Sequence, residues 1–94
     1  MLVGILTFQI LLDNSRSLKN KRSKIKPLIH QLHKKFNVSV AEIGCLENWS
    51  QSIIACVIVG NEKRFLEKSL QEVLKYLESN FLDMQFADIK IEIW

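Results

Sequence analysis

The chain of 94 residues alternates between apolar segments and short polar turns. Residues 2–12 and 53–59 carry apolar side chains on both faces, a pattern typical of central strands. Residues 38–43 are rich in β-branched side chains and predict a third strand. Residues 87–94 alternate apolar and polar side chains and predict a half-buried last strand. The residues of this strand that we expect to face the core are Ala87, Ile89, Ile91 and Ile93.

Two further stretches carry apolar residues at helical spacing and predict amphipathic helices. The first stripe consists of Leu18, Ile25, Leu28, Ile29, Leu32 and Phe36. The second consists of Phe65, Leu66, Leu70, Val73, Leu74 and Leu77. We expect Ser17 to cap the first helix and Asn61 to cap the second. Asn37 is the expected left-handed residue that closes the first helix.

Pro27 falls inside the first helical pattern. A proline there removes the hydrogen bond to the Ser23 carbonyl and clashes with the preceding turn. The segment is therefore either one kinked helix or a separate first turn followed by a helix that starts near Lys26. We prefer the kinked helix.

The predicted order of elements is β-α-β-β-α-β, over a single domain of residues 1–94. This order is typical of an α+β, ferredoxin-like two-layer sandwich, in which both helices cover one face of a four-stranded antiparallel sheet. Right-handed crossovers place the first and third strands in the centre, and these are the strands that are apolar on both faces. The uncovered face is a candidate partner surface. Its expected residues include Thr7, Gln9, Asp88, Lys90, Glu92 and Trp94.

Charge is distributed unevenly along the chain. No acid occurs between Asp13 and Glu42, so residues 14–41 carry +8, whereas residues 42–94 carry five bases and nine acids, or −4. A dense positive field of this kind attracts polyanions. We therefore predict a nucleic-acid footprint on the solvent face of the first helix, and a merely solvated face is the alternative. The footprint consists of Arg16, Lys19, Lys21, Arg22, Lys24, Lys26, Lys34 and Lys35.

The residues around the basic run favour structured RNA or the ribosome as the partner. No aromatic residue precedes Phe36 in the run, so we expect contacts to backbone and shape rather than base stacking. Residues 53–59 contain no aromatic ring, which argues against an RNA-recognition motif, whose third strand carries stacking aromatics.

Candidate catalytic chemistry is sparse, so we expect a protein that is not an enzyme and needs no cofactor. An acylphosphatase-like enzyme shares the strand order and would use Arg16, but residues 13–17 contain no glycine to wrap a phosphate. His30 and His33 stand one turn apart without a third ligand, so no metal site is expected. Cys56 lies mid-strand, where burial excludes a nucleophile.

The two cysteines do not predict a disulfide. If residues 46–51 form a hairpin turn, Cys45 lies opposite Ser52 and Cys56 lies opposite Ala41. The sulfurs are then on the order of 13 Å apart along the strands, beyond the reach of a disulfide. No stretch has the pattern of a signal peptide or the length of a membrane-spanning helix. A cytoplasmic, reducing location is expected.

Two tryptophans and one acid are candidate contact residues. Trp49 in the hairpin loop either covers the end of the core, which we prefer, or is an exposed anchor. Trp94 points to the open sheet face by alternation and is the second anchor candidate. A homodimer through this face or an edge strand is the alternative function. Glu42 is expected to form a salt bridge with the basic helix rather than to bind a partner.

Four segments together resemble a known family. They are Leu2-Val3-Gly4, Ser17-Leu18-Lys19-Asn20-Lys21-Arg22, Phe36-Asn37-Val38-Ser39-Val40-Ala41-Glu42, and Trp49. Spaced over nearly the whole chain, they resemble the YlxP-like family of small bacterial proteins, a domain of unknown function. The resemblance implies a ferredoxin-like fold. It also implies an RNA-linked role, because genes of the family often lie among those for translation initiation and ribosome maturation. It supplies no catalytic residues.

Overall fold

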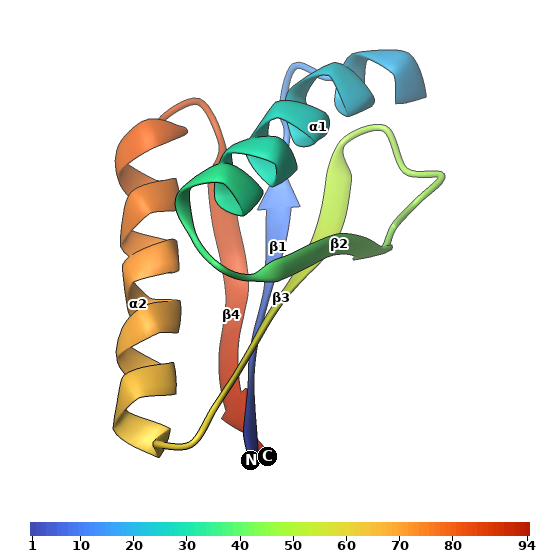
Figure 1. Ribbon diagram of the computed structural model, residues 1–94. Coiled ribbons are helices and arrows are strands. Elements are labelled where there is room, and N and C mark those ends of the chain that lie inside the picture. Colours follow the sequence, from blue (N-terminus) through green and yellow to red (C-terminus); the bar gives the residue numbers. More distant parts are fainter.

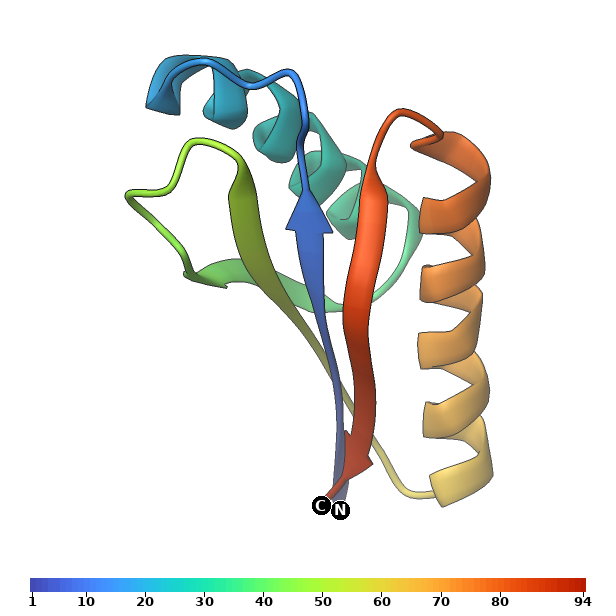
Figure 2. The ribbon, with the colours of Figure 1, turned by 180° about the vertical axis from the view of Figure 1, so that it is seen from behind.

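The computed structural model describes all residues, 1–94, and confirms the predicted order of elements (Figure 1). The elements are β1 (Leu2–Leu11), α1 (Leu18–Lys35), β2 (Ser39–Gly44), β3 (Gln51–Gly60), α2 (Lys63–Asn80) and β4 (Gln85–Ile93). The four strands form one antiparallel sheet in the order β2-β3-β1-β4. Both helices lie on one face, and the view from behind shows the other face uncovered (Figure 2). The fold is therefore the predicted ferredoxin-like sandwich, with β1 and β3 central.

The core lies between the sheet and the two helices. On β1, Leu6, Phe8 and Ile10 are buried, whereas the residues between them are only half-buried. α1 contributes Ile25, Leu28 and Leu32 to this core, and α2 contributes Leu70, Val73 and Leu77. Burial of one face of each element follows from the periods of 3.6 and 2 residues that the sequence carries.

α1 is one continuous helix of 18 residues, and Pro27 lies inside it. The side-chain oxygen of Ser17 accepts a hydrogen bond from the backbone N–H of Asn20 at 3.0 Å, so the predicted N-cap is confirmed. The Pro27 side chain is exposed. The alternative of a separate first turn is wrong, because the helix continues through the proline.

Three details at the helix ends differ from the predictions. Asn37 does not close α1, because it has no positive φ; the helix ends at Lys35, and its C-cap Phe36 is extended with φ −124°. Asn61 does not cap α2, whose N-cap is Glu62 without a side-chain hydrogen bond. Phe65 was expected in the core but is 55% exposed, because it lies beside the buried stripe that Leu66 begins.

β4 departs from simple alternation at a bulge. Thr7 pairs with Lys90 and Gln9 pairs with Ala87, so two residues of β4 oppose one residue of β1. Asp88 within the bulge has φ 50°, in the left-handed region. Because of the extra residue, the side chains of β4 that come before the bulge point to the opposite faces from those that simple alternation predicts. Ala87 therefore lies on the open face, Phe86 takes the core position against Phe8, and Ile89 is 42% exposed.

The β2–β3 hairpin also contains an irregularity, between Glu42 and Gly44. Gly44 pairs with Ile53, as the predicted register requires, but beyond the irregularity Cys56 lies opposite Val40 rather than Ala41. Both cysteines are free. Cys45 adopts φ 58° where the chain leaves β2. Neither helix is long and apolar enough to cross a membrane.

Candidate nucleic-acid interface

Seven of the eight predicted basic residues lie at the surface of the α1 region. Lys24 is half-buried and the others are exposed. None of the seven forms an ion pair, because the two salt bridges of the molecule are Lys21–Glu42 and Lys90–Glu92. We call these seven residues the exposed bases: Arg16, Lys19, Arg22, Lys24, Lys26, Lys34 and Lys35.

Three of the exposed bases surround one hollow. Lys19, Arg22 and Lys26 line a depression of about 540 Å³ together with the smaller side chains of Ser23 and Pro27. Their helical positions place all three on one flank of α1. Long cationic side chains around short uncharged ones form a surface into which a phosphate can enter with several donors around it.

The C-terminal end of α1 is held by α2. The ammonium of Lys35 lies 5.2 Å from the centroid of the Tyr76 ring, within the range of a cation–π interaction. The Tyr76 hydroxyl donates a hydrogen bond to Oε1 of Gln31 at 2.9 Å. These contacts join the C-terminal half of α1 to α2.

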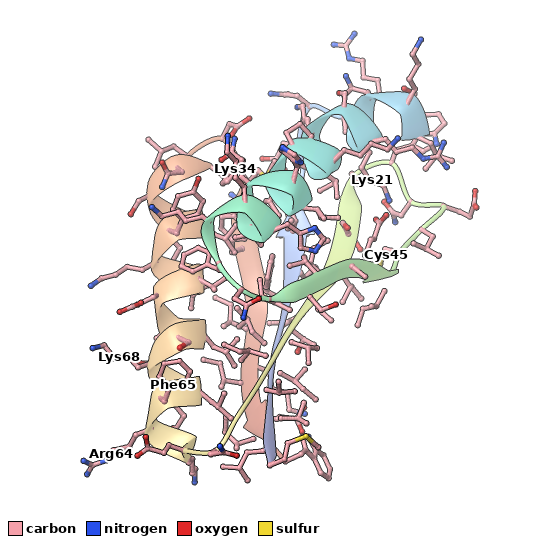
Figure 3. The ribbon with its side chains drawn as sticks, in the orientation of Figure 1. Lys21, Lys34, Cys45, Arg64, Phe65 and Lys68 are labelled. Carbon is pink, nitrogen blue, oxygen red and sulfur yellow. The ribbon has the colours of Figure 1, made fainter.

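Lys21 corrects the predicted footprint, because it is 1% exposed and cannot reach a phosphate. Its ammonium lies 3.0 Å from the Glu42 carboxylate. It also donates hydrogen bonds to three backbone carbonyls of the β2–β3 hairpin, those of Cys45 at 2.8 Å, Leu46 at 3.3 Å and Gln51 at 3.2 Å. Figure 3 shows Lys21 between α1 and this hairpin. Lys21 therefore fastens the start of α1 to both arms of the hairpin.

Glu42 completes the same buried group. Its Oε2 accepts a hydrogen bond of 2.6 Å from the Ser52 hydroxyl, in addition to the ion pair with Lys21. Lys21, Glu42 and Ser52 are called the Lys21 hub below. Buried charges are tolerated when they are paired and hydrogen-bonded, as these are. The expected salt bridge of Glu42 to the basic helix is confirmed.

The sequence contained a signal for the hub that the charge pattern obscured. Lys21 stands three residues after Leu18 and four before Ile25, within the spacing that continues through Leu28 and Leu32. A base on the apolar stripe of an amphipathic helix needs a buried partner. Glu42, on the next strand, is the nearest acid that follows it in the chain.

The other candidate residues have structural or surface positions. Nε2 of His33 accepts a hydrogen bond from the Val40 backbone N–H at 3.2 Å, which ties α1 to the start of β2. No group of three or more His, Cys, Asp or Glu side chains gathers in the molecule. Burial raises the pKa of the Cys56 thiol to about 11, so it stays protonated at neutral pH and is a poor nucleophile, as expected.

The two tryptophans are both exposed. Trp49 is 56% exposed and Trp94 is 71% exposed. The preferred role of Trp49 as a cover of the core is therefore wrong, because the hairpin loop holds its ring in solvent.

Comparisons with known proteins agree with the resemblance seen in the sequence. Residues 3–91 match the model of a family described as "Protein of unknown function (DUF503)". The uncharacterized protein YlxP of Bacillus subtilis (strain 168) is 31% identical over 78 residues, which cover 83% of this chain and 85% of that protein. Neither description names an activity, a ligand or a partner.

Proposed function

We propose, from the premise that this chain belongs to the DUF503 family, that it is a non-enzymatic protein that binds structured RNA, with ribosomal RNA as the first candidate. The observation that carries the proposal is the absence of any acidic partner for the exposed bases, while the one ion-paired base of the same helix, Lys21, is buried. Bases that serve only to solvate a surface usually alternate with acids and form ion pairs with them.

The geometry of α1 favours contacts to the phosphate backbone. Its 18 residues span about 27 Å at 1.5 Å per residue, a length that reaches several successive phosphates. α1 carries no aromatic side chain among the exposed bases, and the one ring that contacts them, Tyr76 of α2, lies against Lys35 at the C-terminal end of the helix. Double-stranded and structured RNA is bound largely through shape and phosphate contacts, which need no aromatic platform.

The test is a salt titration of binding to ribosomal RNA and to a generic RNA duplex. Lys19→Glu with Arg22→Glu reverses two bases of the hollow and should lower the affinity for RNA by roughly 100-fold, since each reversal replaces a phosphate contact by repulsion. Both side chains are exposed, so the melting temperature should hardly change.

The matched control is Lys63→Glu with Arg64→Glu. It exchanges the same two residue types, also exposed, in the first turn of α2. Figure 3 shows Arg64 projecting from α2 away from the sheet. If α1 is the interface, the control keeps most of the affinity. Equal losses in both variants would show only an effect of net charge. Unchanged affinity in the α1 variant would refute the proposal.

A second measurement separates RNA from an acidic protein partner. The protein would be recovered from cells with its partners, with and without RNase treatment. RNA-dependent association disappears on treatment, whereas association with an acidic protein survives it and contradicts the proposal.

A further inference from the structure

The sheet face opposite the two helices is covered by nothing in the monomer (Figure 2). Strand alternation identifies its residues, because Leu6, Phe8 and Ile10 point into the core and the odd-numbered positions of β1 point away. The pairings of β1 with β3 and β4 extend this face across the sheet. Its apolar side chains include Val3, Ile5, Ile53, Val57, Val59 and Trp94.

The largest exposed side chains of this face gather at one end. Val3 pairs with Val59 on β3, and it exchanges two backbone hydrogen bonds of 2.7 and 2.8 Å with Trp94. Val59 is 61% exposed and Trp94 is 71% exposed. Three apolar side chains thus form a row across β3, β1 and the end of β4, with the aromatic ring at its edge. Exposed apolar groups of this size mark interaction sites.

Charge separates this surface from the RNA-binding surface proposed above. The charged residues that the pairing places on the open face are Lys90 and Glu92, which lie opposite Thr7 and Ile5 and form an ion pair of 3.6 Å. Their charges cancel. Six of the seven exposed bases belong to α1 and Arg16 directly precedes it, and α1 lies on the other layer (Figure 1). A polyanion therefore finds no attraction on the open face, and an apolar partner fits it better.

We infer that the open face binds a second copy of this chain, packed sheet against sheet. The size of the face is the first reason. The strands have 6 to 10 residues, or about 20–33 Å each, and four strands span about 19 Å, so the area of the sheet is about 550 Å². Side-chain relief increases the accessible area above this value, towards the about 800 Å² that each partner contributes to a standard interface.

The distribution of side-chain size is the second reason. On β2, β3 and β1 the middle of the face holds small residues, since Thr7 pairs with Ala55 and Ala55 pairs with Ala41, whereas Lys90 stands beside Thr7 on the edge strand β4. Larger residues stand at both ends, with Trp94 at one and Ile53 near the other. A two-fold axis that lies between the two sheets, over the small centre and perpendicular to the strands, places the Trp94 end of one copy over the Ile53 end of its partner. This arrangement is self-complementary, as a two-fold interface requires, and brings the sheets to about 10 Å.

The experiment is analytical ultracentrifugation of the full chain over a range of concentrations and at two salt concentrations. The expected species at high concentration has twice the monomer mass of 10.9 kDa, with little dependence on salt because the contacts are apolar. Ala55→Glu places a charge at the centre and should give a monomer with an unchanged circular dichroism spectrum. Thr7→Lys serves the same purpose if Ala55→Glu does not fold.

Trp94→Ala should weaken the dimer by about tenfold or more, as the loss of an aromatic anchor does. Trp49→Ala is the matched control, because the same exposed residue type is removed from the hairpin loop, outside this face. A wild-type protein that stays monomeric at the highest concentrations overturns the inference. So does a dimer that survives both central substitutions. The sedimentation experiment contains no RNA. The dimer proposal can therefore fail while the RNA-binding proposal stands, and the reverse also holds.

Discussion

Lys19 and Lys21 are two residues apart on the same helix, and the structure assigns them opposite environments. Lys19 is exposed and lines the basic hollow without an acidic partner. Lys21 is buried, paired with Glu42 and hydrogen-bonded to three carbonyls of the hairpin. The side chains are chemically identical, so the difference comes from their positions around the helix and from the hairpin groups that meet Lys21. Two residues turn the helix by about 200°, which moves a side chain from solvent to core.

This comparison shows that a run of bases is not one functional unit. Lys21 contributes to the shape of the molecule, because it holds the β2–β3 hairpin against α1. The exposed bases contribute a positive electrostatic field and surface donors that are free for a partner. Stability should therefore respond to one set and nucleic-acid binding to the other.

The largest effect is expected for Lys21→Met, which keeps most of the side-chain volume and removes the charge. Glu42 and three carbonyls then lose their buried donor, and the free energy of unfolding should fall by about 3–5 kcal/mol. Urea denaturation measures it. Lys19→Met is the matched control and should change stability by less than about 0.5 kcal/mol. A similar fall in the free energy of unfolding in the two variants would mean that the buried contacts of Lys21 do not stabilise the fold.

The next effect concerns the coupling within the hub. Glu42→Leu alone should also destabilise, because it leaves the Lys21 ammonium buried without its counter-charge. The double variant Lys21→Met with Glu42→Leu should be more stable than the sum of the single losses predicts, by about 1–3 kcal/mol. A double-mutant cycle of urea denaturation curves measures this term. Strict additivity would show that the ion pair contributes nothing of its own.

Pro27→Ala tests the exposed side of the same helix. Alanine restores a backbone donor within α1, so we expect a neutral or stabilising change, smaller than the about 3 kcal/mol that separates proline from alanine in a helix interior. Thermal and urea unfolding measure it, with Lys26→Ala as the neighbouring exposed control. A loss of more than about 1 kcal/mol would show instead that the fixed φ of proline stabilises this turn.

The smallest effect on stability is expected for Lys19→Gln with Arg22→Gln. Both residues are exposed and unpaired, so the free energy of unfolding should change by less than about 0.5 kcal/mol. RNA binding should nevertheless weaken, and the slope of log affinity against log salt should fall by about one for each lost phosphate contact. An unaltered slope would mean that neither base touches a phosphate.

The sequence by itself determined the order of the elements and the fold class, because periods of 2 and 3.6 residues are local properties. It also determined that one helix carries the basic charge, since no acid interrupts residues 14–41. Core positions followed from the same periods, as Leu28, Leu32 and Leu70 illustrate.

Only the tertiary structure decided which of these bases face solvent and how the strand ends are arranged. Lys21 is buried because Glu42 and the hairpin carbonyls meet it there, and such a meeting depends on residues 21 to 30 positions away. The bulge at Asp88 likewise depends on how β4 pairs with β1, and it moved Ala87 to the open face. Trp49 is exposed because the hairpin loop carries it away from the core. Each of these outcomes depends on contacts between distant segments, which local patterns do not encode.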